Sequence, residues 1–224
     1  LSIAYVTEDF QNIILRTDMS TGNRTILSGN GNGTGDAIGQ PYSLICPSSP
    51  TEIYYSDGSN RAVYSVDTTN GNRTEISGSG RGTGVTINSL GNITLSPDES
   101  SIYYNDRIQN ALVKIDIASG DRTIVSNNST GTGPSLDYAS GLAINSDETS
   151  AYLLEYIQNA IIHIDIASGD RTIISSDSVG SGPSYRGTIR NLTINSDNTL
   201  LYAIIDSGLV EIDIATGNRI FISR

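Results

Sequence analysis

The chain has 224 residues with 13 basic and 24 acidic side chains, which gives a net charge of −11. This acidity excludes a nucleic-acid partner, because phosphate contacts need clustered Lys and Arg. No run approaches the roughly 18 apolar residues of a membrane-spanning helix. One Cys and one His exclude an internal disulfide framework and any metal site that needs two histidines.

The whole chain is a repeat of one unit, and the landmarks of a D-x-x-[ST/N]-G-[ND]-R motif occur in five copies. Its aspartates are Asp18, Asp67, Asp116, Asp165 and Asp213, its glycines are Gly22, Gly71, Gly120, Gly169 and Gly217, and its arginines are Arg24, Arg73, Arg122, Arg171 and Arg219. An upstream tyrosine keeps the same step at Tyr5, Tyr54, Tyr103, Tyr152 and Tyr202. A fixed period of this length indicates a repeat architecture.

Each unit contains four short β-rich segments separated by turn residues, with no helical period. In the fourth unit these are 142–144, 151–155, 160–166 and 172–175. Four strands per unit of about 49 residues are typical of a propeller blade, whereas solenoid coils are usually shorter. In chain order the predicted blades are 3–27, 42–77, 91–126, 140–175 and 190–223, all within one all-β propeller domain, 1–224.

The first unit, 3–27, begins at its second strand and lacks the innermost one. We consider three interpretations: a five-bladed ring with one three-stranded blade, a portion of a longer protein that supplies the strand, or a strand donated by another molecule. Propellers usually close by completing one blade with strands from both ends of the chain. The second interpretation is the expectation, because the chain does not begin with Met.

The blade pattern resembles those of the NHL and YVTN groups of bacterial repeat propellers. The YVTN pattern is matched at 93–98 and 102–106, and the NHL pattern at 141–145 and 151–155. The resemblance implies a propeller whose relatives include scaffolds, surface proteins, sensors and some enzymes. More distantly, it implies a likeness to calcium-dependent lactonases.

Alternating strand direction divides the turns between two faces. On one face lie the five Gly-[Asn/Asp]-Arg hairpins, whose glycines suit tight turns. We expect the flanking Asp and Arg to pair locally or to bridge to a neighbouring blade; the alternative is a ring of arginines that binds an anion. On the other face lie the glycine-rich connectors between blades, which we expect to serve the crossing of the chain.

This second face also receives the acids that end the second strand of each blade, namely Glu8, Asp57, Asp106 and Glu155. The last copy has Ile205 at this position, and the neighbouring Asp206 is the candidate substitute. A ring of carboxylates is one way to hold Ca²⁺, with Ser43, Asn92 and Asn191 as neutral ligands. The favoured alternative is that each acid caps its own loop.

Four tyrosines lie in or beside the loops of the same face and are candidate contacts for a sugar or a peptide: Tyr42, Tyr138, Tyr156 and Tyr185. Asp206 is a further candidate ligand contact on this face. Tyrosines within strands are expected to pack between blades with hydrated hydroxyls. We expect His163 to be structural and Cys46 to lie in the core. Without a Ser-His-Asp set, no catalytic residues are predicted.

These observations predict a secreted, periplasmic or cell-surface propeller that acts as a binding module or scaffold for a protein, peptide or carbohydrate. A calcium-dependent hydrolase of the lactonase type is one alternative. The other is an assembly subunit that self-associates through its incomplete blade.

Overall fold

The computed structural model describes residues 3–49, 51–185 and 189–223, and these form strands without helices. Blade 1 contains β1 (Ile3–Glu8), β2 (Ile13–Asp18) and β3 (Arg24–Ser28). Blade 2 contains β4 (Pro41–Ile45), β5 (Glu52–Asp57), β6 (Ala62–Asp67) and β7 (Arg73–Ser77). Blade 3 contains β8 (Leu90–Leu95), β9 (Ser101–Asp106), β10 (Ala111–Asp116) and β11 (Arg122–Ser126). Blade 4 contains β12 (Ala139–Ile144), β13 (Ser150–Glu155), β14 (Ala160–Asp165) and β15 (Arg171–Ser175). Blade 5 contains β16 (Ile189–Ile194), β17 (Leu200–Ile205), β18 (Gly208–Asp213) and β19 (Arg219–Ser223).

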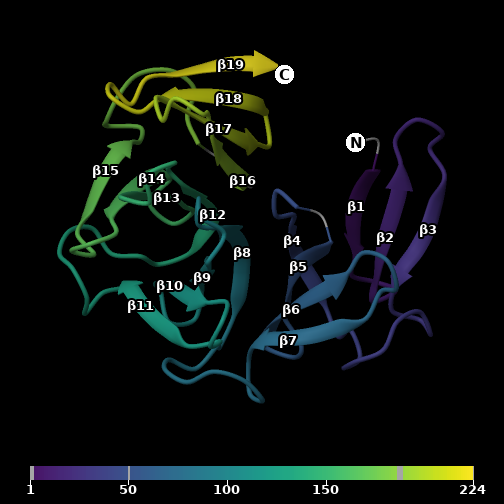
Figure 1. The fold of residues 1–224 in the computed structure, drawn as a ribbon. Coiled ribbons are helices and arrows are strands. Elements are labelled where there is room, and N and C mark those ends of the chain that lie inside the picture. The colour runs from purple at the N-terminus through teal and green to yellow at the C-terminus, as the bar shows by residue number, and fades with distance from the viewer. Residues whose placement is uncertain (1–2, 50, 186–188, 224) are drawn as a thin grey trace.

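Each blade is an antiparallel sheet in which strands follow one another in chain order from the axis outward (Figure 1). The innermost strands β4, β8, β12 and β16 contact one another in sequence around the axis, and β1 contacts β4. Blade 1 has three strands, and β1 pairs only with β2. The predicted five-bladed propeller with an incomplete first blade is therefore confirmed. None of the described residues belongs to a helix long and apolar enough to cross a membrane.

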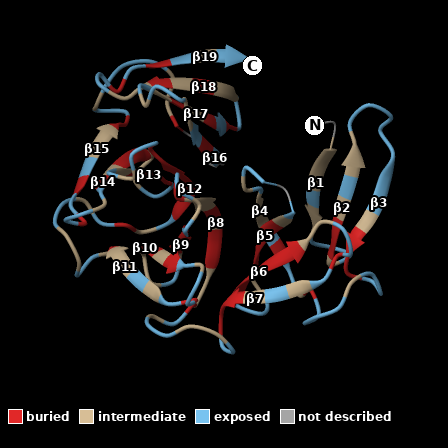
Figure 2. Cartoon of the chain, in the orientation of Figure 1, coloured by how far each residue is buried: buried red, intermediate tan, exposed pale blue. Residues whose placement is uncertain are grey.

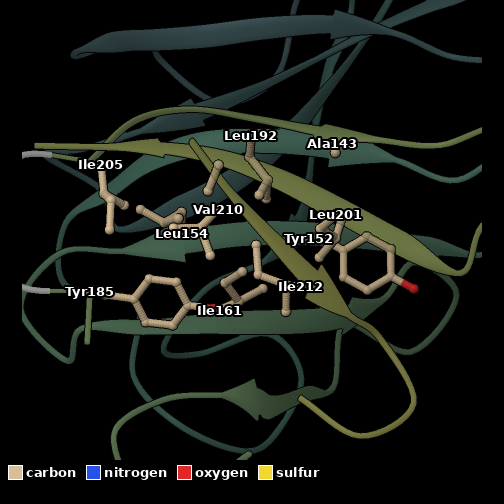
Figure 3. Packing of buried hydrophobic residues seen from close by; sticks show 11 residues of the cluster. Ala143, Tyr152, Leu154, Ile161, Tyr185, Leu192, Leu201, Ile205, Val210 and Ile212 are labelled. Carbon is tan, nitrogen blue, oxygen red and sulfur yellow. The ribbon is translucent and has the colours of Figure 1, made fainter. Parts of the chain in front are cut away.

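The core lies between successive blades, because the sheets of blades 2, 3 and 4 bury both of their faces against their neighbours, and those of blades 1 and 5 bury one. Four hydrophobic clusters join blades 1 and 2, 2 and 3, 3 and 4, and 4 and 5. In the last of these, Leu154 and Ile161 of blade 4 pack against Leu192 and Val210 of blade 5 (Figure 3). Burying such a side chain contributes about 1.5–3 kcal/mol. Buried residues are accordingly concentrated in the second and third strands of blades 2 to 4, and exposed residues are more frequent in the outermost strands (Figure 2).

The hairpin arginines bridge neighbouring blades. Arg122 of blade 3 donates from Nη1 to the Ser77 hydroxyl at 2.7 Å and from Nε to the Val85 carbonyl at 2.6 Å. Ser77 belongs to the last strand of blade 2, and Val85 to the connector between the two blades. The hairpin aspartates instead accept hydrogen bonds within their own turn, as Asp116 does from Ser119. In the part of the chain that the structure describes, the only ion pair joins Lys114 to Glu148. The bridging prediction is confirmed, whereas the local Asp–Arg pair and the anion-binding ring are wrong.

Neighbouring hydroxyl and backbone N–H groups lower the pKa of several aspartates in the turns. The Ser96 hydroxyl, followed by the backbone N–H and hydroxyl of Ser100, lowers the pKa of Asp98 from 3.8 to about 2. A lowered folded-state pKa adds stability above pH 3.8 that is lost as the pH falls through the folded-state value. We expect the melting temperature to fall between about pH 4 and pH 2, and less steeply in Asp98→Asn. If the melting temperatures of the parent protein and Asp98→Asn fell equally over this pH range, the lowered pKa of Asp98 would not contribute to stability.

Three predictions about single residues have different outcomes. His163 is structural, since its Nε2 lies 2.9 Å from the Ser150 hydroxyl and its ring contacts Tyr152. Cys46, expected in the core, is exposed because it follows the end of β4. The hydroxyls of Tyr55 and Tyr104, expected to be hydrated, are buried between blades and have no hydrogen-bond partner among the described residues.

Candidate binding site at the mouth of the propeller

A cavity of about 960 Å³ opens on the face where the blade connectors and the loops between second and third strands meet. We call it the mouth cavity. Its walls come from all five blades, which places it on the propeller axis. It is lined by Tyr5, Val6, Thr7, Tyr42, Ser43, Leu44, Asn92, Arg107, Tyr138, Ser140, Tyr156, Ile157 and Asn191.

Arg107 lies between two tyrosines that come from neighbouring blades. Its guanidinium carbon is 5.2 Å from the centre of the Tyr42 ring and 5.1 Å from that of Tyr138. Nη2 donates to the Tyr42 hydroxyl at 2.8 Å, Nη1 to the Tyr138 hydroxyl at 3.5 Å, and Nε to the Ala139 carbonyl at 3.3 Å. The cation–π contacts and these hydrogen bonds fix the guanidinium in one orientation.

Tyr156 completes the aromatic wall. Its ring meets that of Tyr138 edge to face, with centroids 6.0 Å apart. Tyr42, Tyr138 and Tyr156 are 45%, 43% and 43% exposed, so a large part of each side chain is available to a ligand. Across the cavity, Asn92 donates to the Asn191 side chain at 3.2 Å. Rigid aromatic side chains with polar ends, next to an arginine, are the residue types that dominate protein-binding surfaces.

Arg107 is the only charged residue among those that line the mouth cavity within the described chain. The protein as a whole carries a net charge of −11, so one cation and no carboxylate among the described lining residues is a local reversal of sign. A guanidinium offers a planar fork of N–H donors that matches a carboxylate. This surface therefore favours a ligand with an anionic group for Arg107 and apolar or planar groups for the tyrosines beside it.

The acids expected to surround the mouth are turned into the protein, where they join each connector to its own blade. Asp57 accepts from the backbone N–H groups of Gly39, Gln40 and Asn60 at 2.7–3.0 Å. Glu155 accepts from those of Asp137, Tyr138 and Ile157. Burial raises the pKa of Glu155, although these hydrogen bonds oppose the shift.

Of the other two acids, Asp106 behaves in the same way, whereas Glu8 caps only the loop that follows its strand. Asp106, buried like Asp57 and Glu155, accepts from the backbone of Asn88, Ser89, Ile108 and Gln109. Glu8 accepts from the backbone N–H of Gln11. The interpretation that each acid caps its own loop is confirmed for all four.

The donor set does not fit a calcium ion. Each carboxylate belongs to a different blade and already accepts backbone hydrogen bonds, whereas Ca²⁺ needs six to eight oxygen ligands converging at about 2.3–2.6 Å. No three His, Cys, Asp or Glu side chains of the described ranges come close enough to hold a metal ion. Ser43, Asn92 and Asn191 do line the mouth cavity, but without the acids that were expected to join them.

Two candidate ligand contacts lie away from the mouth. Tyr185 is fully buried in the cluster between blades 4 and 5 (Figure 3). It donates to the Ser175 hydroxyl at 2.9 Å, and its ring centre lies 5.0 Å from the guanidinium carbon of Arg219. It occupies the connector position of Ile38, Ile87 and Leu136, all of them buried. Asp206 is exposed in the turn between β17 and β18 and does not line the cavity. Ile205, at the position of the other acids, belongs to the core.

Sequence reasoning missed Arg107, which is the central residue of the mouth. The available signal was its register: Arg107 lies 49 residues before Tyr156, so the two occupy the same loop position in successive blades. Since Tyr156 was selected for its place on this face, the same argument applied to Arg107.

No family model matches the chain, and no curated protein matches it in sequence. Among solved structures, the chain resembles one described as "Crystal structure of Nidogen/Laminin Complex", with 14% sequence identity and a TM-score of 0.73. The match covers 98% of this chain and 74% of that one. At this identity the likeness shows the propeller fold alone, and the NHL or YVTN type of the repeat stays a prediction.

Proposed function

We propose that this propeller is a binding scaffold that holds a peptide segment of a partner protein in its mouth cavity, with Arg107 recognising a carboxylate of that segment. The observation that carries the proposal is the position of Arg107, fixed between Tyr42 and Tyr138 as the single charged residue among the described residues of the cavity lining. The fold likeness to a propeller from a protein–protein complex is compatible with this role.

The chemistry of the wall supports a peptide. Tyr42, Tyr138 and Tyr156 offer flat faces for side chains or peptide planes, and their hydroxyls offer hydrogen bonds. Asn92 and Asn191 provide amide groups that match a peptide backbone. Arg107 has donors left beyond the three hydrogen bonds it makes within the protein, since a guanidinium carries five N–H groups.

The proposal is tested by selecting ligands from a displayed library of random 12-residue peptides. We expect the selected peptides to be enriched in Asp and Glu, and to bind Arg107→Ala at least ~10-fold more weakly, as is typical when one partner of a charged hydrogen-bonded pair is removed. Arg107→Lys is expected to bind at an intermediate level, because Lys keeps the charge but loses the planar fork.

Arg61→Asn is the matched control. Arg61 lies in the equivalent loop of blade 2 and does not line the cavity. Its φ of 52° is shared by Asn12, Asn110 and Asn159 at the same loop position, so Asn removes the charge without backbone strain. Unchanged peptide binding by Arg107→Ala, or equal losses in both variants, would reject the proposal. Selective binding of acidic glycans on an array, without peptide binding, would identify a carbohydrate ligand instead.

Action outside the cytoplasm, as a secreted, periplasmic or cell-surface protein, is part of the same proposal. It is supported by the acidic composition, the near-identical blades and the resemblance of the repeat to NHL and YVTN propellers. Fractionation of the cells that produce the protein, followed by immunodetection, tests it.

A further inference from the structure

Every contact between successive blades uses the same set of positions. On the side that faces the next blade, blades 2, 3 and 4 bury a tyrosine of the second strand, the residue two positions later, and the second residue of the third strand. These are Tyr54, Ser56 and Val63 in blade 2, Tyr103, Asn105 and Leu112 in blade 3, and Tyr152, Leu154 and Ile161 in blade 4. The last-strand serine adds a polar contact, because Ser77, Ser126 and Ser175 each receive Nη1 of the next blade's arginine.

Blade 5 presents this same face without a neighbour. Ile204, at the position of the fully buried Leu154, is 50% exposed, and so is Ile222, at the position of Ile174. Ser223 occupies the position of Ser175 but is exposed, and no hydrogen bond within the described chain includes its side chain. We call this surface the free face of blade 5.

Blade 1 presents the complementary half. Val6 is 47% exposed, whereas the residues at its position in blades 2 to 5, namely Tyr55, Tyr104, Leu153 and Ala203, are fully buried. Arg24, the motif arginine of blade 1, is exposed, and its side chain makes no hydrogen bond within the described residues. A Cβ added to Gly22 would meet no atom within 4 Å, whereas one added to Gly71, Gly120, Gly169 or Gly217 would meet the preceding blade.

These two half-interfaces border one opening in the ring but do not meet. Figure 1 shows the sheet of β16–β19 and the sheet of β1–β3 on either side of that opening. Arg24 and Ser223, which would form the fifth arginine–serine contact if blades 5 and 1 packed directly, are both exposed. Blade 5 therefore lacks the contacts that each other blade makes with the blade after it, and blade 1 lacks those that each other blade makes with the blade before it.

We infer that the opening is an interface for one further blade of the same repeat, joined to this chain by a connector like those between its other blades. The hairpin arginine of that blade would donate to Ser223, and its last-strand serine would accept from Arg24. Its two sheet faces would cover Ile204 and Ile222 on one side and Val6 on the other. This inference rests on the contacts between blades and not on the ligand proposed for the mouth, although Val6 also lines the mouth cavity.

The geometry favours a single blade over a second copy of the chain. An occupant must present two complementary faces back to back, which one sheet does, as blades 2, 3 and 4 show. A second copy has the same two free faces, but they lie on separate sheets, blades 1 and 5. It can therefore cover one side of the opening and not both.

The test is an extended chain in which a second copy of residues 177–223 follows Arg224, so that the repeat continues in register. We expect the melting temperature of the extended protein to rise by at least ~5 °C. The added segment should also resist proteolysis as well as blades 2 to 4 do. Arg24→Ala is the diagnostic variant: it should leave the melting temperature of the original chain unchanged and lower that of the extended chain.

Three results would overturn the inference. In the first, the added segment is digested at the rate of an unfolded tail. In the second, Arg24→Ala lowers the melting temperature of the original chain as much as that of the extended chain, which would mean that the added blade supplies no contact to Arg24. In the third, sedimentation shows the original chain to be a dimer that Arg24→Ala dissociates, which would make a second copy the occupant.

Discussion

Gly71→Ala is expected to destabilise the propeller by about 3 kcal/mol or more, whereas Gly22→Ala, the same change one repeat earlier, is expected to cost about 1 kcal/mol. Both glycines precede the Asn-Arg pair of their hairpins, and both have a positive φ, 75° for Gly71 and 73° for Gly22. The cost of placing an L side chain in this conformation is therefore the same for both.

The difference comes from the neighbouring blade. A Cβ on Gly71 would overlap the carbonyl oxygen of Leu27 and approach Ser28, which belong to the last strand of blade 1. Both obstacles are backbone atoms, so the blades themselves would have to move apart. A Cβ on Gly22 would meet nothing within 4 Å. Overpacking of a tight contact costs about 1–3 kcal/mol and occasionally more, in addition to the backbone strain.

Urea unfolding of the two variants beside the parent protein measures this difference. Equal losses for Gly71→Ala and Gly22→Ala would show that the cost lies in the hairpin turn alone and that the blade contact at Gly71 contributes nothing. Should Gly71→Ala fail to fold, Gly120→Ala gives the same comparison with Gly22→Ala, because a Cβ on Gly120 would approach the Ile76 carbonyl oxygen of the preceding blade less closely, at 2.5 Å.

Much of the fold could be predicted because a propeller is specified locally and then repeated. A hairpin glycine such as Gly120 and a run such as 160–166 indicate strand, turn and strand within one unit. The constant step along the chain then predicts the number and order of the blades. Packing between blades was harder, because it depends on which side of each strand faces the next sheet. Two alternatives for the hairpin arginines therefore stayed open until the contact of Arg122 with Ser77 was seen.

The site was predicted only in part, and for a related reason. Counting strand directions places Tyr42, Tyr138 and Tyr156 on the correct face, and the structure brings all three to the mouth cavity. It does not reveal whether a side chain points to the axis or into the blade. Tyr185 therefore proved to be core, and the acid ring proved to be a set of internal loop caps. Arg107 was missed because the other blades have no arginine at its loop position, and a search for repeated residues does not find a residue that occurs in one blade only.

Arg171→Ala is expected to destabilise the propeller by about 3 kcal/mol, while Arg24→Ala in the same motif should change the stability by less than about 0.5 kcal/mol. Arg171 is buried, and its guanidinium connects blade 4 to blade 3 and to the connector between these two blades. It donates to the Ser126 hydroxyl at 2.8 Å and to the carbonyls of Asn127 at 2.6 Å and Pro134 at 2.6 Å.

Removing the guanidinium leaves these acceptors without their donor in a site from which water is largely excluded. Each unsatisfied buried group costs about 1–3 kcal/mol, because the hydrogen bond is lost while the desolvation remains. Arg171→Lys should recover less than half of the loss. An ammonium keeps the charge, but it is a single point donor and cannot replace both Nε, which donates to Pro134, and Nη1, which donates to Ser126 and Asn127.

Urea unfolding of Arg171→Ala, Arg171→Lys and Arg24→Ala against the parent chain provides the measurement, with the same buffer and protein concentration for all four. The expected order of stability places the parent and Arg24→Ala together, Arg171→Lys below them and Arg171→Ala lowest. If Arg24→Ala were as damaging as Arg171→Ala, the arginine would act within its own hairpin. The bridge that joins each blade to the one before it would then not be a source of the stability of the ring.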